Sequence, residues 1–280
     1  MRFHKTSTSL ALVVLVLFCL FSVISFAEAR CSLVRLRGTW TLGWEGRTGR
    51  DNRLIYGLGA MQVRSGGRVQ NGWIAQTVNA QQNATFSQIL EGNFSAIRSA
   101  HFCFIKLTLE VNASSSATPP SANFTRPPSV LTFEGVLSND TSYMELIYTS
   151  EPGAHVFGSV SKVKGRCNST ASLRGVWGTT TQYYEGVAQE PREALPYSET
   201  FVCKKQKTCD SFYVFSRDPG RVYNLTGIPH TYVRGSPCGY FRLGGAFDGH
   251  VVVSFGEGLY KMMTWPSRHA IFAKYFGAKR

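Results

Sequence analysis

The chain has 280 residues, among them 27 Gly, 19 Phe, 12 Tyr and 5 Trp, and its formal net charge is +13. The charge is spread evenly, because residues 31–166 hold 13 basic and 8 acidic residues and residues 167–280 hold 14 and 8. This distribution excludes a basic tail. It fits either a solvated basic surface or loose attraction to anionic partners such as glycans and membranes.

The first 29 residues are predicted to form a secretory signal peptide. Arg2 and Lys5 make a basic start, residues 10–26 are almost wholly apolar, and a small-residue cleavage motif ends at Ala29. An uncleaved anchor is the alternative, since the apolar run approaches the roughly 20 residues of a membrane span. No other stretch is long or apolar enough to cross a bilayer. We therefore expect a secreted, extracellular protein with no transmembrane span after cleavage.

Sequons and cysteines agree with that compartment. Of the 7 cysteines, Cys19 is lost with the signal, and the remaining even number suits a chain that folds where disulfides form. Each Asn-x-Ser/Thr sequon marks a candidate exposed N-glycan. Secretion also leads us to expect no nucleic-acid partner. The candidate glycosylation sites are Asn83, Asn93, Asn112, Asn123, Asn139, Asn168 and Asn224.

Short alternating runs dominate the mature chain. Residues 104–111 and 251–255 are typical of half-buried strands, whose successive side chains face opposite sides. Asn71-Gly72 and Asp248-Gly249 tolerate the positive φ angles of tight turns and mark chain reversals. The best helix candidate spans residues 93–100. Short strands at regular spacing predict an all-β fold.

Residues 112–129 differ in composition from the rest of the chain. They are rich in Ser and Pro and contain two of the sequons. Such a segment buries too little apolar surface to order itself, so it is predicted to be a flexible, glycosylated loop. Sequence similarities between the two halves of the chain lie on both sides of this segment: residues 36–40 resemble residues 173–177, and residues 133–137 and 155–157 resemble residues 243–247 and 269–272. We therefore interpret the segment as an insertion within a domain rather than a linker between domains.

A pentapeptide occurs twice in the chain. Residues 36–40 read Leu-Arg-Gly-Thr-Trp and residues 173–177 read Leu-Arg-Gly-Val-Trp, and each copy follows a cysteine, Cys31 or Cys167. The repeat predicts an internal duplication, with a first β domain over residues 30–166 and a second over residues 167–280. Domains of this length are large enough to hold a core of their own.

Cysteine spacing predicts the disulfides. The span from Cys31 to Cys103 nearly equals the span from Cys167 to Cys238, so equivalent disulfides Cys31–Cys103 and Cys167–Cys238 are expected. Six cysteines allow 15 pairings in principle, and the symmetry of the repeat selects this one. Cys203 and Cys209 are then left to form Cys203–Cys209, which closes a small loop in the second domain only.

The two Gly-x-Trp pairs, Gly38 with Trp40 and Gly175 with Trp177, resemble the first-strand motif of calycins, the lipocalin and avidin group of antiparallel barrels. The resemblance implies that each Trp plugs one end of a barrel and that each Gly permits close backbone approach. We therefore expect two tandem calycin-like β-barrels, with β-sandwiches as the alternative. No ligand-binding residues follow from the resemblance.

The polar residues that follow each tryptophan motif do not form a catalytic pattern. Arg37 and Arg174 are interpreted as exposed rim residues. Glu45 and Glu185 are interpreted as turn residues, since each domain offers only one such carboxylate for glycosidase chemistry.

Other sequence patterns also fail to indicate catalysis. The mature histidines show no zinc spacing, and no nucleophile elbow or P-loop is present. No metal or cofactor is therefore expected. The Cys203–Cys209 loop holds Lys204, Lys205 and Lys207, which are candidate contacts for an anionic glycan or cell-surface partner, although a solvated loop is the simpler interpretation.

Taken together, the sequence favours a secreted, disulfide-bonded, N-glycosylated and non-enzymatic binding protein. Its partner would be an apolar small ligand inside a barrel or an anionic partner at the surface. An extracellular coat or structural glycoprotein is the alternative, and a secreted hydrolase is the weaker alternative.

Overall fold

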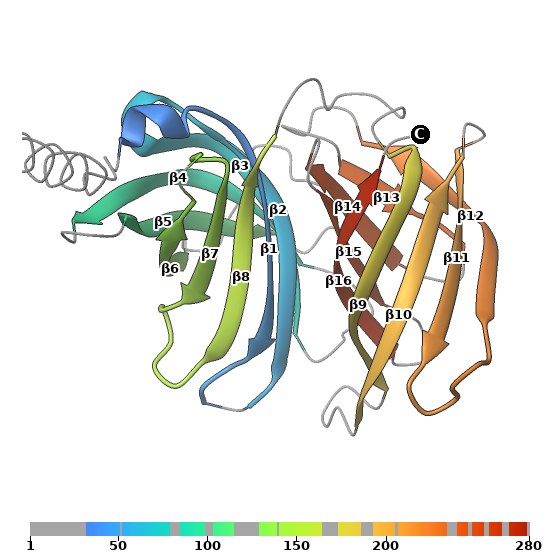
Figure 1. The fold of residues 1–280 in the computed structure, drawn as a ribbon. Helices are drawn as coiled ribbons and strands as arrows, with labels where there is room; N and C mark the ends of the chain where they lie inside the picture. The colour runs from blue at the N-terminus through green and yellow to red at the C-terminus, as the bar shows by residue number, and fades with distance from the viewer. Residues whose placement is uncertain are drawn as a thin grey trace, which may run out of the picture.

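The computed structural model describes residues 32–50, 52–78, 85–98, 103–114, 129–138, 140–163, 173–185, 193–204, 207–233, 240–245, 248–254, 258–264 and 269–278 (Figure 1). These residues form β-strands and two short 3-10 helices, which confirms the prediction of an all-β chain. None of the described segments forms a helix with the length and apolarity needed to cross a bilayer. The 3-10 helices are η1 (Leu33–Leu36) and η2 (Ser65–Gly67). The strands are β1 (Gly38–Arg47), β2 (Leu54–Val63), β3 (Arg68–Val78), β4 (Thr85–Arg98), β5 (Cys103–Ser114), β6 (Ser129–Leu137), β7 (Tyr143–Tyr148), β8 (His155–Lys162), β9 (Gly175–Glu185), β10 (Glu193–Cys203), β11 (Thr208–Phe215), β12 (Tyr223–Tyr232), β13 (Tyr240–Leu243), β14 (Asp248–Ser254), β15 (Gly258–Thr264) and β16 (His269–Ala278).

Strands β1–β8 form the first closed barrel, in which each strand pairs with the next and β8 returns to β1. Trp40 on β1 lies opposite Met61 of β2 and Lys162 of β8. Strict alternation places one face of each strand inside: Leu107 and Leu109 of β5 are buried in the core, whereas Thr108 between them faces outward. The hydrophobic interior of this barrel is built from such inward rows.

Strands β9–β16 form the second closed barrel in the same strand order, with β16 returning to β9 (Figure 1). Trp177 on β9 lies opposite Phe201 of β10 and Gly277 of β16. The strands of the first barrel all fall within residues 30–166, and those of the second within residues 167–280. Because the last strand of each set pairs with the first, both sets form closed barrels and not β-sandwiches.

The repeated pentapeptide adopts the same local structure in both barrels. Trp40 and Trp177 are buried, and each indole Nε1 donates a hydrogen bond to the carbonyl four residues earlier, at 2.7 Å to Leu36 and 3.0 Å to Leu173. Gly38 has φ 143° and Gly175 has φ 142°, a region that residues with a side chain rarely adopt. The glycine is therefore required by its backbone angle, and not only by close approach.

The hairpin after the second strand of each barrel also matches. In the first barrel Val63 lies opposite Val69 across the β2–β3 hairpin. In the second barrel Cys203 lies opposite Cys209 across the β10–β11 hairpin, and the two cysteines form a disulfide. The two pairs are separated by the same six positions, so the second barrel has a covalent bond where the first has two apolar side chains.

The two barrels lie side by side, with β1 and β2 of the first against β14 and β15 of the second (Figure 1). Aromatic rings also pack between the barrels, where β13 of the second barrel meets β3 and β4 of the first. Tyr240 of β13 lies 4.4 Å from the ring of Trp73 and 6.0 Å from that of Phe86, measured between ring centroids. All three side chains are buried although they are on the outer walls of their barrels, which explains the unusually apolar outer face of β2 and β3.

Several expectations from the sequence are wrong in detail. Asn71-Gly72 does not mark a chain reversal but lies within β3, paired with β2, and Asp248-Gly249 forms the first two residues of β14. Glu185, expected in a turn, is the last residue of β9 and lies opposite Glu193. Within the helix candidate at residues 93–100, residues 93–98 are instead part of β4, because Phe94 and Ala96 belong to the inward row of the first barrel, and residues 99–100 lie outside the described residues. The Ser/Pro-rich loop does not begin at residue 112, since β5 continues to Ser114 and pairs with β4 up to that residue. Glu45 is not in a turn: it lies within β1, opposite Tyr56 of β2 and Phe157 of β8.

Two weaker sequence similarities also link the halves of the chain: residues 155–157 resemble residues 269–272, and residues 133–137 resemble residues 243–247. His155 and His269 begin the last strands of their barrels, β8 and β16, but their registers differ by one position. His155 lies opposite Arg47, seven residues after Trp40, whereas His269 lies opposite Glu185, eight residues after Trp177. The two histidines therefore do not occupy equivalent positions. Residues 133–137 lie in β6, the sixth strand of the first barrel, whereas Leu243 ends β13, the fifth strand of the second. The similarity of residues 133–137 to residues 243–247 therefore arose from composition and not from position in the fold.

Candidate functional site

The two barrels differ clearly in one inward row of side chains. In the second barrel this row crosses β9–β12 and holds two tyrosines, a glutamate and a threonine; in the first barrel the matching row is mainly apolar. The second-barrel row is Thr179, Glu199, Tyr213 and Tyr223, in successive pairs across the strands. The first-barrel row is Leu42, Gly59, Ile74 and Ser87. The second barrel therefore has a buried carboxylate in this row, whereas the matching row of the first barrel has no ionisable side chain.

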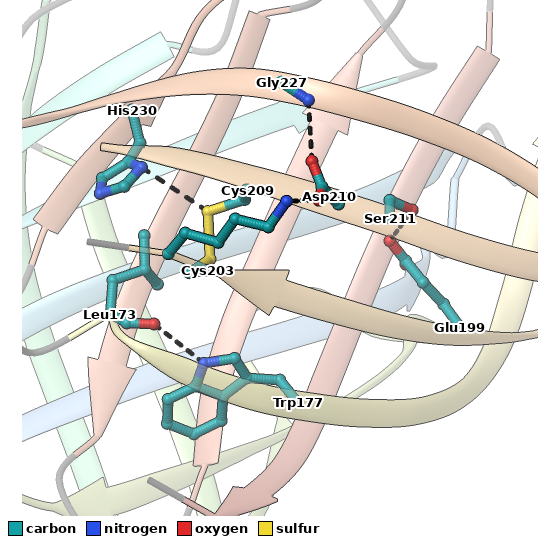
Figure 2. Close-up of a disulfide and its surroundings, with 10 residues drawn as sticks. Leu173, Trp177, Glu199, Cys203, Cys209, Asp210, Ser211, Gly227 and His230 are labelled. Atoms are coloured by element: carbon teal, nitrogen blue, oxygen red, sulfur yellow. Dashed lines mark hydrogen bonds and ion pairs between the residues drawn. A yellow bond between two sulfur atoms is a disulfide. The ribbon is translucent and has the colours of Figure 1, made fainter. Parts of the chain in front are cut away.

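Glu199 is the centre of a polar group that we call the Glu199 cluster, made of Tyr197, Glu199, Ser211, Tyr213 and Tyr223. The glutamate is 3% exposed. Its carboxylate accepts a hydrogen bond from the Tyr197 hydroxyl at 3.0 Å and another from the Ser211 hydroxyl at 2.5 Å, the second of which is visible in Figure 2. Burying a carboxylate is costly unless hydrogen bonds compensate, and these two neutral donors provide part of that compensation.

Aromatic rings extend the cluster toward the β11–β12 hairpin. Tyr213 and Tyr223 stack with centroids 5.6 Å apart and planes 13° apart, and Phe215 contacts both rings edge-on. Two arginines of the hairpin lie over this group: Arg217 is 5.3 Å from the centroid of Phe215 and Arg221 is 4.8 Å from that of Tyr223. The end of the barrel away from Trp177 is thus bordered by aromatic faces and guanidinium groups.

Burial and charge within the cluster shift the ionisation of its tyrosines. The pKa of Tyr213 is raised by burial first and then by the negative charge of Glu199. The pKa of Tyr223 is raised mainly because its hydroxyl donates a 2.6 Å hydrogen bond to Asp218. Both hydroxyls therefore stay protonated at neutral pH, and that of Tyr223 already donates to Asp218.

A second polar group surrounds the disulfide at the Trp177 end of the same barrel (Figure 2). A register shift between Cys209 and Ser211 marks a β-bulge in β12, where Thr226 and Gly227 face the single residue Asp210 of β11. The Asp210 carboxylate accepts a 2.8 Å hydrogen bond from the Gly227 amide and pairs with Lys204. The lysine, followed by the amide of Gly227, lowers the pKa of Asp210. The bulge is therefore held by an ion pair and a backbone donor.

His230 contacts the disulfide from the neighbouring strand. Its Nδ1 lies 3.6 Å from Sγ of Cys209, and the ring is buried. Burial, followed by the charge of Lys207, lowers the pKa of His230, so the ring is neutral at physiological pH. A disulfide sulfur is not a nucleophile, which makes this contact a packing interaction.

The three lysines proposed as an anionic contact have different surroundings. Lys204 is engaged by Asp210, which reduces the charge that it offers to a partner. Lys207 is exposed, with a left-handed φ of 59° at the hairpin tip. Lys205 lies outside the described residues. The lysines are thus not a uniform cationic surface.

Several other predicted positions lie outside the described residues. They include the signal peptide, Cys31, Cys167, Cys238 and the sequons at Asn83, Asn123, Asn139 and Asn168. Cys103, at the start of β5, is disulfide-bonded, as expected for one half of the predicted Cys31–Cys103 pair. Among the described sequons, Asn93 and Asn224 are exposed, whereas Asn112 is buried. Arg37 is exposed and Arg174 half-buried, as rim residues would be.

Sequence reasoning missed the Glu199 cluster, although a signal for it exists. Residues 195–203 alternate, and once Cys203 is placed inward by its disulfide, Phe201, Glu199, Tyr197 and Leu195 must face inward as well. It also missed Lys162, which contacts both Trp40 and the chain just before it at the closed end of the first barrel. Its ammonium donates a 2.8 Å hydrogen bond to the Arg35 carbonyl and lies 5.9 Å from the centroid of Trp40.

The Glu199 cluster offers polar and aromatic groups inside the second barrel. Among the residues described, no group of three or more His, Cys, Asp or Glu side chains is placed to hold a metal ion. The Glu199 carboxylate can accept hydrogen bonds from a bound hydroxyl or amine, and the tyrosine faces can pack against a planar group.

Comparisons with known proteins give little further guidance. No protein-family model matches the chain. No curated protein matches its sequence. Among solved structures, kievitone hydratase from Nectria haematococca aligns with a TM-score of 0.23 and 9% identity, over 90% of this chain and 91% of that one.

Two further structures align in a similar way. A protein of unknown function from the DUF3598 family of Nostoc punctiforme aligns with a TM-score of 0.27 and 8% identity, over 90% of this chain and 99% of its own. A putative outer membrane protein from Bacteroides fragilis aligns with a TM-score of 0.24 and 11% identity, over 87% of this chain and 98% of its own. At these TM-scores the alignments establish neither a shared fold nor a shared function.

Proposed function

We propose that the protein is a secreted, non-enzymatic binding protein whose second barrel takes a small ligand at the Glu199 cluster. The ligand would be a planar molecule that carries a hydrogen-bond donor, an amine or a hydroxyl. The observation that supports this function is the buried carboxylate of Glu199, held by the hydroxyls of Tyr197 and Ser211 inside a barrel.

The first barrel provides an internal comparison for that interpretation. Its matching row holds Leu42, Gly59 and Ile74, so an eight-stranded barrel of this chain does not need a buried carboxylate in order to close. Desolvating a carboxylate costs several kcal/mol that hydrogen bonds only partly offset. A ligand contact is a reason to keep such a group, because recognition needs a few polar groups at fixed positions in an otherwise apolar site.

The proposal includes a calycin-like ancestry and an internal duplication. Both are supported by the matching backbone angles of Gly38 and Gly175, the matching indole hydrogen bonds, and the matching hairpin pairs. Under this interpretation the interior of the first copy became packed with apolar side chains, whereas the second copy kept or acquired polar ones.

Calorimetric titration with tyramine tests the function, because tyramine has a ring, an amine and a hydroxyl. We expect saturable binding to the secreted protein, and at least about tenfold weaker binding to Glu199→Gln, since a hydrogen bond to a charged group contributes roughly 1.5–3 kcal/mol. Glu134→Gln is the matched control, because Glu134 is a half-buried carboxylate on β6 of the first barrel that pairs with Lys106.

The anion 4-hydroxyphenylacetate serves as a second probe, and we expect it to bind more weakly than tyramine because Glu199 repels its carboxylate. If Glu199→Gln does not fold, Tyr213→Phe removes a hydroxyl of the same cluster and keeps the ring. Equal tyramine affinity in wild type and in the folded cluster variants would refute the proposed site.

An extracellular coat or structural glycoprotein remains the second candidate, and one observation favours it. The outer wall of the first barrel exposes several large apolar side chains, among them Ile97, Phe104, Val136, Ile147 and Phe157. Ile97, Phe104 and Val136 lie opposite one another across β4–β6, and Ile147 lies opposite Phe157 across β7–β8. If this surface mediates assembly, sedimentation should show concentration-dependent association that Phe157→Lys reduces and Val222→Lys, an exposed site on the second barrel, does not.

A further inference from the structure

The outer wall of the first barrel contains a hollow of about 450 Å³ over β3–β6. Its lining residues that matter here are Arg68, Glu91, Asn93, Thr108, Glu110 and Val130. The size is within the roughly 300–1,000 Å³ typical of sites for small molecules. The neighbours of these residues along β5, Leu107 and Leu109, are buried in the core, so the hollow is outside the barrel and separate from its interior.

Strand register arranges the hollow in two rows. Asn93 of β4 lies between Arg68 of β3 and Thr108 of β5. In the adjacent row Glu91 of β4 lies opposite Glu110 of β5, which in turn lies opposite Val130 of β6. Two like charges directly opposite each other on neighbouring strands are unfavourable.

These polar groups are not satisfied by one another. Within the part of the chain that the structure describes, no ion pair or side-chain hydrogen bond engages Arg68, Glu91 or Glu110. Val130 is 55% exposed beside them. The hollow therefore offers hydrogen-bond acceptors, a guanidinium donor and one apolar face, a combination that suits a sugar ring, with its hydroxyls and its apolar face.

Asn93 is also the acceptor of a sequon, because Ser95 follows two positions later. Its side chain is exposed and lines the hollow, so a glycan attached there begins inside it. We propose that the hollow is the seat of the N-linked glycan of Asn93, whose first sugars cover Glu91, Glu110 and Val130. The sugar hydroxyl and acetamido groups donate to the two carboxylates and relieve their opposition. This inference rests on the proposed secretion of the chain.

The other described sequons provide contrasting sites. Asn224 is exposed on β12, opposite Phe212, and its glycan would extend into solvent. Asn112 is 9% exposed, and its Oδ1 has no hydrogen-bond partner in the structure. We expect a seated glycan at Asn93, a free glycan at Asn224 and no glycan at Asn112.

The experiment uses the full chain secreted from eukaryotic cells. Glycopeptide mass spectrometry reports occupancy at each sequon, and a peptide-N-glycanase measures how fast each glycan is released from the native protein. We expect release at Asn93 to be at least about tenfold slower than at Asn224, because a seated glycan must first detach from the wall. The rates should become equal after denaturation.

Sequon variants supply a second measurement. Ser95→Ala removes the Asn93 sequon but keeps Asn93, and we expect it to lower Tm by about 2–4 °C. Ser95→Thr, which keeps the sequon, and Thr226→Ala, which removes that of Asn224, should leave Tm unchanged. An unoccupied Asn93 beside an occupied Asn224, or equal native release rates at the two sites, would overturn the glycan seat alone. Absence of glycans at every sequon would overturn both the seat and the proposed secretion.

Discussion

In the first barrel Trp44 on β1 lies over Gly57 on β2, whereas at the same level of the second barrel Thr181 on β9 lies opposite Tyr197 on β10. A Cβ on Gly57 would come within 2.3 Å of the Trp44 ring, so the glycine is what makes room for the indole. The bulk is on the first strand in one barrel and on the second strand in the other. A barrel interior can thus be filled from either strand of a pair.

The same comparison continues one row further along the barrels. Leu42 with Gly59 in the first barrel corresponds to Thr179 with Glu199 in the second. The exchange of large and small residues is repeated here, but the large residue is now charged. Filling alone would be achieved by an apolar side chain, so the charge of Glu199 is the part of the difference that packing does not explain.

The largest expected effect is the loss of the indole that fills the first barrel. Trp44→Ala should lower the free energy of unfolding by about 3–5 kcal/mol, because a buried ring is lost and Gly57 cannot fill the space. Thr181→Ala, at the equivalent position of β9, should cost about 1 kcal/mol or less. Urea denaturation of both variants checks this difference. Equal losses in the two variants would show that the first strand does not supply most of the packing at this position in the first barrel only.

Glu45 and Gln182 occupy equivalent positions of β1 and β9, five residues after each Trp. Burial raises the pKa of Glu45 from 4.5 to about 7. The Glu45 carboxyl binds its proton more tightly in the folded protein than in the unfolded chain. Below pH 4.5 it is protonated in both states and does not lower the free energy of unfolding, which then falls as pH rises from 4.5 through 7. The loss above pH 7 should be roughly 2–3 kcal/mol, at 1.36 kcal/mol per pKa unit with some allowance for partial exposure.

Glu45→Gln, which gives β1 the residue of β9, should remove that pH dependence. Unfolding measured at pH 5 and pH 8 should show the variant more stable than wild type at pH 8 and similar to it at pH 5. Glu145→Gln, an exposed carboxylate on β7, is the control and should leave the pH dependence unchanged. A wild-type stability that does not fall between these pH values would contradict the raised pKa.

The paired hairpins allow one barrel to be converted toward the other. Because Val63 and Val69 hold the positions of Cys203 and Cys209, the double variant Val63→Cys/Val69→Cys should form a disulfide in the first barrel. The chain-entropy model gives about 2 kcal/mol for a loop of this length. The opposite change, Cys203→Val/Cys209→Val, should cost a similar amount. Non-reducing peptide mapping detects the new bond, and two free thiols in the double variant would show that the hairpins are not equivalent.

Sequence patterns predicted the overall fold better than they predicted the candidate site, and particular residues show why. Trp40 and Trp177 were recognisable because their motif recurs with the same neighbours, and Cys203 and Cys209 because the other spans were symmetric. Glu199 has no partner motif, since its donors Tyr197 and Ser211 come together only through strand alternation and register. Glu45 looked like a turn residue because Gly46 follows it, and its burial depends on strand pairing and barrel packing that local sequence does not encode.

The smallest expected change in stability comes from the contact between Lys162 and Trp40 in the first barrel. Lys162 lies opposite Trp40, donates to the Arg35 carbonyl and places its ammonium 5.9 Å from the indole centroid, whereas Gly277 is opposite Trp177 in the second barrel. Partial burial lowers the pKa of Lys162. Lys162→Met keeps the stem that packs on Gly38 and removes the charge, so it should cost about 1 kcal/mol from the hydrogen bond and cation–π contact. If thermal unfolding of Lys162→Met matches wild type, the stem alone holds the plug, and both barrels close their Trp ends by packing.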